Sequence, residues 1–180
     1  AEYPLLRQYK NSDSLKLKQL TNWLNKNVSD EKANQYHNFL KTWQPTINSL
    51  QCDEFVNAAL ASSWHAEIRK DGSCRLKNVA LENKNQLMFR YVTIHNGGTC
   101  TIYLDSLNSK PYKTFPVAKT TNGWKIATIE ISPVSGTHDV YFKYSNPTIN
   151  ANNPSGLLFE WFQFGEKLPG ESKPGYDSIY

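Results

Sequence analysis

The most informative segment for the fold is Asn96-Gly97-Gly98-Thr99-Cys100-Thr101-Ile102-Tyr103-Leu104-Asp105. An Asn-Gly-Gly turn leads into a segment in which the apolar residues Cys100, Ile102 and Leu104 occupy every second position. Such alternation is typical of a strand with one buried face. It returns in residues 139–144. The sequence therefore predicts β-strands joined by tight turns.

Other segments from residue 50 onward are also rich in β-branched and aromatic residues, as strands are. No helix of 10–15 residues is indicated between them, which argues against a parallel sheet. Six to nine short strands at this spacing predict a mainly β protein, an antiparallel β-sandwich. The strands are expected at residues 76–81, 86–95, 100–105, 125–131, 138–144 and 157–164. Turns are expected at Asp71-Gly72, Asn96-Gly97-Gly98, Asn122-Gly123, Ser135-Gly136 and residues 150–156.

The first 47 residues have a different period. Apolar side chains recur there at helical spacing, and Pro45 ends the pattern. The sequence predicts a small helical hairpin over residues 1–47, either the tail of an upstream domain or a docking appendage. The sandwich is expected over residues 48–165 and an irregular tail over 166–180. The apolar helical positions are Leu17, Leu20, Trp23, Leu24, Tyr36, Phe39, Leu40 and Trp43.

Charge and composition exclude several function classes. The net charge is +4 and the lysines are spread along the chain, so no nucleic-acid-binding patch is indicated. No apolar stretch reaches the roughly 18 residues of a membrane-spanning helix, and no membrane insertion is expected. No nucleophile, metalloprotease or phosphate-loop motif is present. We expect a protein that is not an enzyme.

The three cysteines leave two alternatives open. Cys52, Cys74 and Cys100 contain no C-x-x-C pair, so no zinc or iron–sulfur site is indicated. In an oxidising compartment one disulfide, Cys74 to Cys100, is one outcome. Two or three buried free thiols are the other.

Several segments in order resemble a family 6 carbohydrate-binding module over about residues 50–164. The opening residues 50–55, the strand–turn–strand of 87–105, the loop Thr120-Thr121-Asn122-Gly123-Trp124, the strand after Gly136 and the closing segment 156–164 carry the likeness. The resemblance implies a jelly-roll β-sandwich. It also implies a non-catalytic domain that binds polysaccharides or oligosaccharides and targets an attached enzyme to glycan.

The resemblance implies a loop cleft formed by two aromatic side chains and an Asn. Trp124 matches one aromatic, and Asn122 lies in the same loop. Trp64 is the only aromatic offered for the second position, and Leu158 stands where the family has Asn. The carbohydrate-binding residues are therefore predicted to be Trp124, Asn122, Trp64, Asn152, Asn153 and His95. Packing at the rim remains the alternative role for Trp124.

The family also carries a structural calcium, which would fall here on Gln51, Asp53 and Glu160. The expected partners are a glycan and an upstream domain of the same polypeptide, such as a glycoside hydrolase or a haem-containing dehydrogenase. The resemblance implies a bacterial, extracytoplasmic monomer: periplasmic, cell-surface or secreted. The rival hypothesis is a structural or docking sandwich without a working sugar cleft, suggested by Leu158 and the missing second aromatic.

Overall fold

A computed structural model describes residues 46–61, 65–150 and 155–165 of the chain. The predicted helical hairpin and C-terminal tail lie almost wholly outside the described residues, so both stay predictions. The described part contains one short 3-10 helix, η1, and nine strands. These are β1 Ile47–Asn48, η1 Ser49–Gln51, β2 Asp53–Ala61, β3 His65–Ala80, β4 Gln86–Val92, β5 Gly98–Leu104, β6 Lys113–Val117, β7 Lys125–Glu130, β8 Thr137–Ser145 and β9 Leu157–Gly165.

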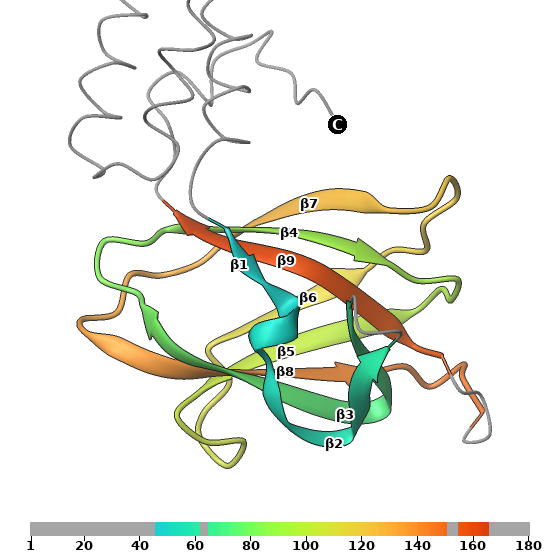
Figure 1. The fold of residues 1–180 in the computed structure, drawn as a ribbon, viewed down its shortest axis with the longest axis horizontal. Helices are drawn as coiled ribbons and strands as arrows, with labels where there is room; N and C mark the ends of the chain where they lie inside the picture. The colour runs from blue at the N-terminus through green and yellow to red at the C-terminus, as the bar shows by residue number, and fades with distance from the viewer. Residues whose placement is uncertain (1–45, 62–64, 151–154, 166–180) are drawn as a thin grey trace, which may run out of the picture. The chain divides into compact units, whose positions relative to one another are not determined.

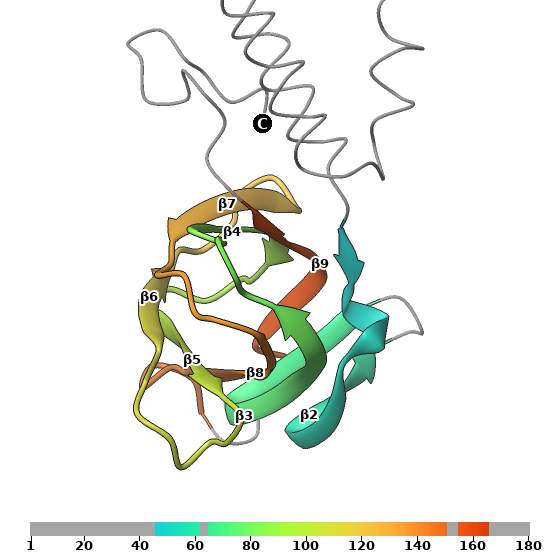
Figure 2. The ribbon, with the colours of Figure 1, turned by 90° about the vertical axis from the view of Figure 1, so that its left-hand side faces the viewer.

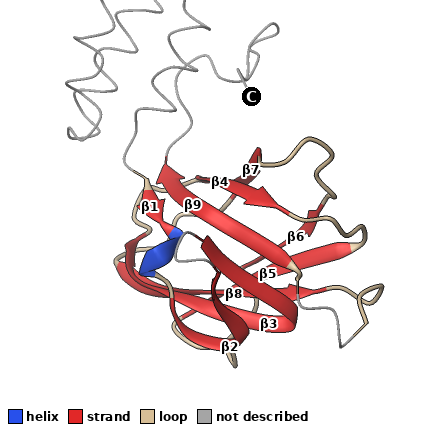
Figure 3. Ribbon diagram, turned by 45° about the vertical axis from the view of Figure 1, so that its right-hand side comes forward, coloured by secondary structure: helices blue, strands red, loops and turns tan. Residues whose placement is uncertain are grey.

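The strands form two layers, as Figures 1 and 3 show. One layer runs β6-β5-β8-β3 with β2 beside β3, and the other runs β9-β4-β7 with β1 beside β9. All pairs are antiparallel. The long β3 belongs to both layers: residues 73–80 pair with β8, whereas residues 66–68 pair with β9. The predicted antiparallel β-sandwich is confirmed.

The core lies between the two layers, which Figure 2 shows from the side. Phe142 of β8 stacks on Phe162 of β9 with ring centroids 4.5 Å apart, and Phe159 lies 4.9 Å from Phe162. Phe159 and Phe162 are three positions apart, yet both face inward because the pairing of β9 with β4 slips between Arg90 and Tyr91. This bulge leaves Trp161 only partly buried.

The Asp71-Gly72 turn is the prediction that proved wrong, because both residues lie inside β3. The pairing of β2 with β3 jumps from Val56–Ser73 to Ala58–Ile68, so β3 bulges there. Asp71 takes the left-handed conformation with φ of 57°. A Cβ on Gly72 would lie 2.3 Å from the backbone oxygen of Asn57. The glycine therefore serves a close approach between two strands rather than a reversal of the chain.

The six expected strands do not include the short β1, β2, β6 or the first half of β3. β2 exposes the apolar side chains of Val56 and Leu60, so its apolar residues do not mark one buried face. β6 contains Pro116, which is tolerated because β6 lies at an edge of the sheet. Buried Phe115 and Val117 alternate with more exposed positions in β6, and buried Ala66 and Ile68 do so in β3. Both runs are too short to identify a strand from the sequence.

The three cysteines are free and buried. Burial raises the pKa of the Cys100 thiol well above its usual range. Within the described ranges, no helix has the length and apolar character needed to cross a membrane.

Candidate functional site

The loop between β6 and β7 ends at Trp124 and lines an open pocket. Residues 119–125 form the walls of this pocket, which has a volume of about 250 Å³. Trp124 is half-buried, whereas Asn122 is exposed. The pocket thus combines a flat indole ring with an amide and two lysines.

Two buried threonines hold this loop against the end of β4. The backbone N–H and the hydroxyl of Thr120 donate to the carbonyl oxygen of Thr93, at 2.9 and 3.1 Å. The backbone N–H of Thr93 donates to the Thr120 hydroxyl oxygen at 3.3 Å. The Thr93 hydroxyl donates to the carbonyl oxygen of Gly156 at 2.8 Å, just before β9. Three segments distant in sequence therefore meet beside the pocket.

Tyr91 anchors the start of the same loop. Its hydroxyl donates to the backbone oxygen of Ala118 at 3.0 Å. The ring belongs to the core, and burial raises the pKa of the hydroxyl. The Trp124 loop is thus fixed by hydrogen bonds at residues 118 and 120.

Side chains from two other strands support the Trp124 ring. The His65 ring of β3 lies 4.5 Å away between centroids, tilted by 39°. The guanidinium carbon of Arg90, on β4, lies 5.3 Å from the Trp124 centroid, within the range of a cation–π contact. Arg90 also forms an ion pair with Glu160 of β9. Burial, and then the charge of Arg90, lower the pKa of His65, which favours the neutral imidazole.

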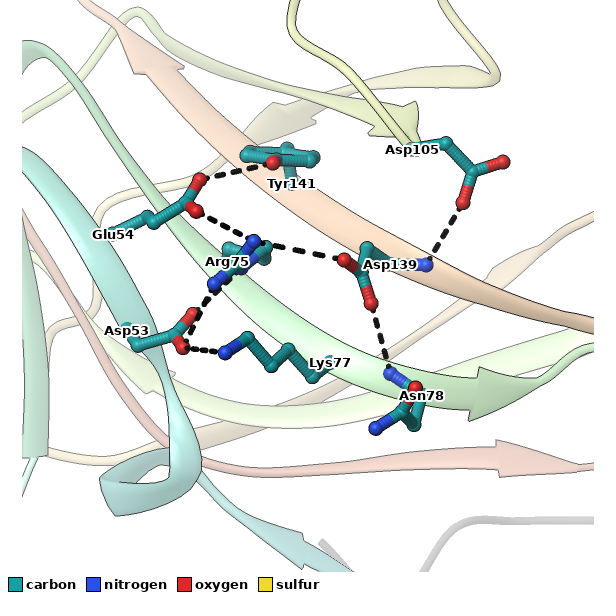
Figure 4. Close-up of polar contacts among 8 residues, drawn as sticks. All are labelled: Asp53, Glu54, Arg75, Lys77, Asn78, Asp105, Asp139 and Tyr141. Atoms are coloured by element: carbon teal, nitrogen blue, oxygen red, sulfur yellow. Dashed lines mark hydrogen bonds and ion pairs between the residues drawn. The ribbon is translucent and has the colours of Figure 1, made fainter.

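A second group of charges lies on β2, β3 and β8, as Figure 4 shows. Arg75 is its centre: Nε and Nη2 donate to Asp53 at 2.8 and 3.0 Å, and Nη1 lies 3.6 Å from Asp139. Arg75 also pairs with Glu54, and Lys77 lies 3.0 Å from Asp53. The Arg75 guanidinium, followed by Lys77, lowers the pKa of Asp53 to about 2. We call Asp53, Glu54, Arg75, Lys77, Asp139 and Tyr141 the Arg75 network.

Comparison with known proteins decides the family. The family model of carbohydrate binding module family 6 matches residues 67–166, more than half of the chain. The chain belongs to family 6 of the carbohydrate-binding modules. The family is non-catalytic, so the module is a binding domain rather than an enzyme. No curated protein matches the sequence.

Solved structures share the fold at low identity. A family 6 module from Clostridium cellulolyticum in complex with xylose is 23% identical with a TM-score of 0.56, covering 68% of this chain and 97% of that one. A β-1,3-glucan-binding module from Bacillus halodurans is 15% identical with a TM-score of 0.55, covering 67% and 95%. A Clostridium stercorarium module in complex with cellobiose is 18% identical with a TM-score of 0.54, covering 68% and 93%.

The structure brings together two of the six predicted sugar-binding residues. Trp124 and Asn122 both line the pocket. His95 follows Thr93, and its backbone N–H donates to the Thr93 hydroxyl at 3.3 Å. The His95 Nε2 atom is buried and has no hydrogen-bond partner among the described residues. Trp64, Asn152 and Asn153 lie outside the described residues, and their roles stay predictions.

The side chains predicted to bind calcium have other charged partners or are exposed in the structure. Calcium takes six to eight oxygen ligands, several from carboxylates. Asp53 is held by Arg75 and Lys77, Glu160 is held by Arg90, and Gln51 is exposed. Within residues 46–61, 65–150 and 155–165, no three acidic, histidine or cysteine side chains could hold one metal ion together. A structural calcium remains an expectation from the family only.

Sequence reasoning missed the residues that support Trp124. Thr93, Thr120 and His65 carry no local signal, because their roles depend on contacts between distant segments. Arg90 does have a local signal in the sequence, because it is a charged residue inside the apolar segment Leu87–Val92. A charge in such a segment needs a partner, which is Glu160 together with the Trp124 ring.

Proposed function

We propose that this module binds a polysaccharide chain at the pocket beside Trp124, with the indole ring stacking on a sugar ring. The observation that carries the proposal is a half-buried Trp at a pocket wall, on a loop fixed by the Thr93–Thr120 pair. A fixed aromatic loses little conformational entropy on binding, which makes it a suitable platform for a flat ligand face. The docking alternative is not favoured.

Asn122 is the second ligand contact that we propose. Its exposed amide lies in the same pocket and offers both a donor and an acceptor to sugar hydroxyls. Trp64, Asn152 and Asn153 are proposed to extend the site. His95 is proposed to join it only if ligand binding exposes its Nε2 atom, which is buried in the structure. With few contacts, the expected Kd lies in the micromolar to millimolar range, about 4–8 kcal/mol.

The experiment is a calorimetric titration of the protein with xylan and β-glucan oligosaccharides, which measures the Kd of each. Trp124→Ala is expected to reduce affinity at least tenfold, since stacking on an aromatic ring is lost, and Asn122→Ala to reduce it less. Tyr103→Ala is the matched control, because Tyr103 is a partly exposed aromatic on β5 in the other layer. Equal affinity in Trp124→Ala and the wild type would contradict the proposed site.

We further propose that the module serves an attached enzyme in an extracytoplasmic bacterial protein. The support is that a non-catalytic binding domain acts by raising the local concentration of what it is joined to. A fusion of the chain to a hydrolase should degrade insoluble glycan faster than the hydrolase alone, with equal rates on soluble substrate. Equal rates on both substrates would contradict targeting.

The domain division and the helical hairpin of residues 1–47 are also proposals. Their support is the helical spacing of apolar residues that ends at Pro45. Limited proteolysis that leaves a stable fragment of about residues 48–165, with loss of helical circular dichroism, is the expected result. A fragment that unfolds once residues 1–47 are removed would contradict an independent sandwich.

A further inference from the structure

Two carboxylates, one on β3 and one on β9, are already paired with arginines. Glu160 pairs with Arg90, which lies over the Trp124 ring. Glu67 of β3 pairs with Arg69, with Oε1 and Nε 3.1 Å apart. Glu67 also lies opposite Leu158 in the pairing of β3 with β9, on the strand that carries Glu160. Both of these carboxylates are thus paired with an arginine.

Two further cations remain unmatched at the pocket itself. Lys119 and Lys125 stand at the two ends of the pocket-lining segment, and both are exposed. Neither has an ion-pair partner in the part of the chain that the structure describes. In the Arg75 network, by contrast, Lys77 is paired with Asp53. The pocket therefore carries two positive charges, Lys119 and Lys125, that no carboxylate of the described residues balances.

We propose that this pocket takes an anionic glycan, in which a sugar carrying a carboxylate or a sulfate group stacks on Trp124. The inference rests on the proposed function and names the chemical class of its ligand. An ammonium group is a point charge with three rotatable donors, so it can meet anionic oxygens at various angles. Lys119 and Lys125 would bind the anionic group while Trp124 and Asn122 bind the sugar ring.

Salt dependence separates this ligand class from a neutral one. Exposed charges are screened over about 10 Å at an ionic strength of 0.1 M and over about 3 Å at 1 M. Binding of an anionic glycan should therefore weaken as salt rises, whereas stacking and neutral hydrogen bonds should be nearly unaffected. Because both lysines are solvent-exposed, each is expected to change affinity by only a few-fold.

The test compares polygalacturonate with its fully methyl-esterified form, which has the same sugar without the charge. A sulfated galactan forms a third arm that distinguishes sulfate from carboxylate. We expect at least fivefold tighter binding to one of the two anionic polymers at 50 mM NaCl, with most of the advantage lost at 500 mM. Lys119→Gln/Lys125→Gln should remove most of the advantage and reduce affinity for the ester by a smaller factor.

The control variant is Lys110→Gln/Lys143→Gln, which changes the net charge equally. Lys110 precedes β6, at the end opposite the pocket, and Lys143 lies on β8; both are exposed. An equal loss in this variant would overturn the inference, since the effect would then come from overall charge. Polyanion binding that survives Trp124→Ala would also overturn it.

The remaining outcomes separate the inference from the proposed function. Binding of neutral glycans that depends on Trp124 but on neither lysine would leave the proposed function standing and refute the anionic ligand. No binding of any glycan by the folded wild-type chain would contradict both. A Trp124-dependent, lysine-dependent and salt-sensitive preference for the anionic polymer would support both.

Discussion

The Trp124 pocket and the Arg75 network are both rich in charge, yet their charges are balanced in opposite ways. In the network, Arg75 meets three carboxylates and Lys77 meets Asp53, so the charges are satisfied between β2, β3 and β8. At the pocket, Arg90 pairs with Glu160, but Lys119 and Lys125 have no ion-pair partner among the described residues. Charges satisfied within the fold hold strands together, whereas unmatched charges at a pocket are available to a ligand.

This difference also separates binding from catalysis. Several carboxylates gather in the Arg75 network, and two facing carboxylates are what a glycosidase requires. Here Arg75 and Lys77 hold Asp53 ionised, and Tyr141 donates to Glu54 at 3.0 Å. Substitutions in the network should therefore change stability and leave glycan binding alone, and substitutions at the pocket should do the reverse. The predictions below test that separation.

The largest effect is expected from Gly72→Ala, where β2 crosses close to β3 beside the network. The new Cβ would lie 2.3 Å from the backbone oxygen of Asn57 and 2.8 Å from that of Val56, so the strands must move apart. We expect the free energy of unfolding to fall by about 3 kcal/mol, as for an overpacked site. Denaturant titration measures it. Gly136→Ala is the control: its φ is +88° but no atom lies within 4 Å, and its cost should be about 1–2 kcal/mol.

Thr120→Val is expected to be the one substitution that affects both stability and binding. It removes the hydroxyl that joins the pocket loop to Thr93 and leaves a buried backbone N–H without its partner. The cost should be about 1–2 kcal/mol. Because the Trp124 loop then becomes less ordered, glycan affinity should also fall several-fold, measured by calorimetry. Thr121→Val, at the exposed neighbouring position, should leave stability unchanged. Unaltered affinity in a destabilised Thr120→Val would refute the proposed anchoring role.

Arg75→Met should lower Tm by a few degrees, with no change in glycan affinity. The substitution keeps the aliphatic stem but leaves Asp53, Glu54 and Asp139 facing one another. In the wild type, the low pKa of Asp53 makes this pair a source of stability that is present above about pH 4 and lost as pH falls towards 2. The acid limb of Tm against pH should therefore flatten in the variant. A loss of glycan binding in a folded Arg75→Met would break the separation of the two regions.

The smallest effect concerns His138, next to the network at the start of β8. Its Nδ1 lies 2.8 Å from a carboxylate oxygen of Asp105, and its Nε2 lies 2.9 Å from the carbonyl oxygen of Ser135. The Asp105 carboxylate, followed by the Ser135 carbonyl, raises the pKa of His138 above 6.5. The stabilisation is therefore full below about pH 6.5 and is lost as pH rises through the higher folded-state pKa.

Because Asp105 is exposed, this contribution should stay under about 1 kcal/mol. The measurement is the difference in unfolding free energy between the wild type and His138→Gln, taken at pH 6 and pH 9. We expect the difference to shrink at pH 9. A difference that grows with pH would reverse the assigned sign, and glycan binding should not respond in either case.

The fold class could be determined from the sequence, and part of the candidate site could be predicted from it. The antiparallel sandwich could be predicted because alternation shows which face of a strand is buried. Turn residues and the order of the segments show where each strand ends and which strand follows. Trp124 and Asn122 could be found because they lie in one loop with a recognisable local pattern. Asp71-Gly72 misled, since the same dipeptide serves a tight turn or a close approach between strands, and only the partner strand distinguishes them.

Only the tertiary structure decided which charges are satisfied and what supports Trp124. Glu160 is 70 positions from Arg90, and Asp53 is 22 positions from Arg75. Such pairings follow from strand register, and a bulge of one residue changes which side chains meet. The residues predicted to hold calcium illustrate this: the sequence supplies Gln51, Asp53 and Glu160, and register places the two carboxylates beside Arg75 and Arg90. The local sequence pattern therefore predicts the fold class, whereas strand register decides which charged side chains pair with one another.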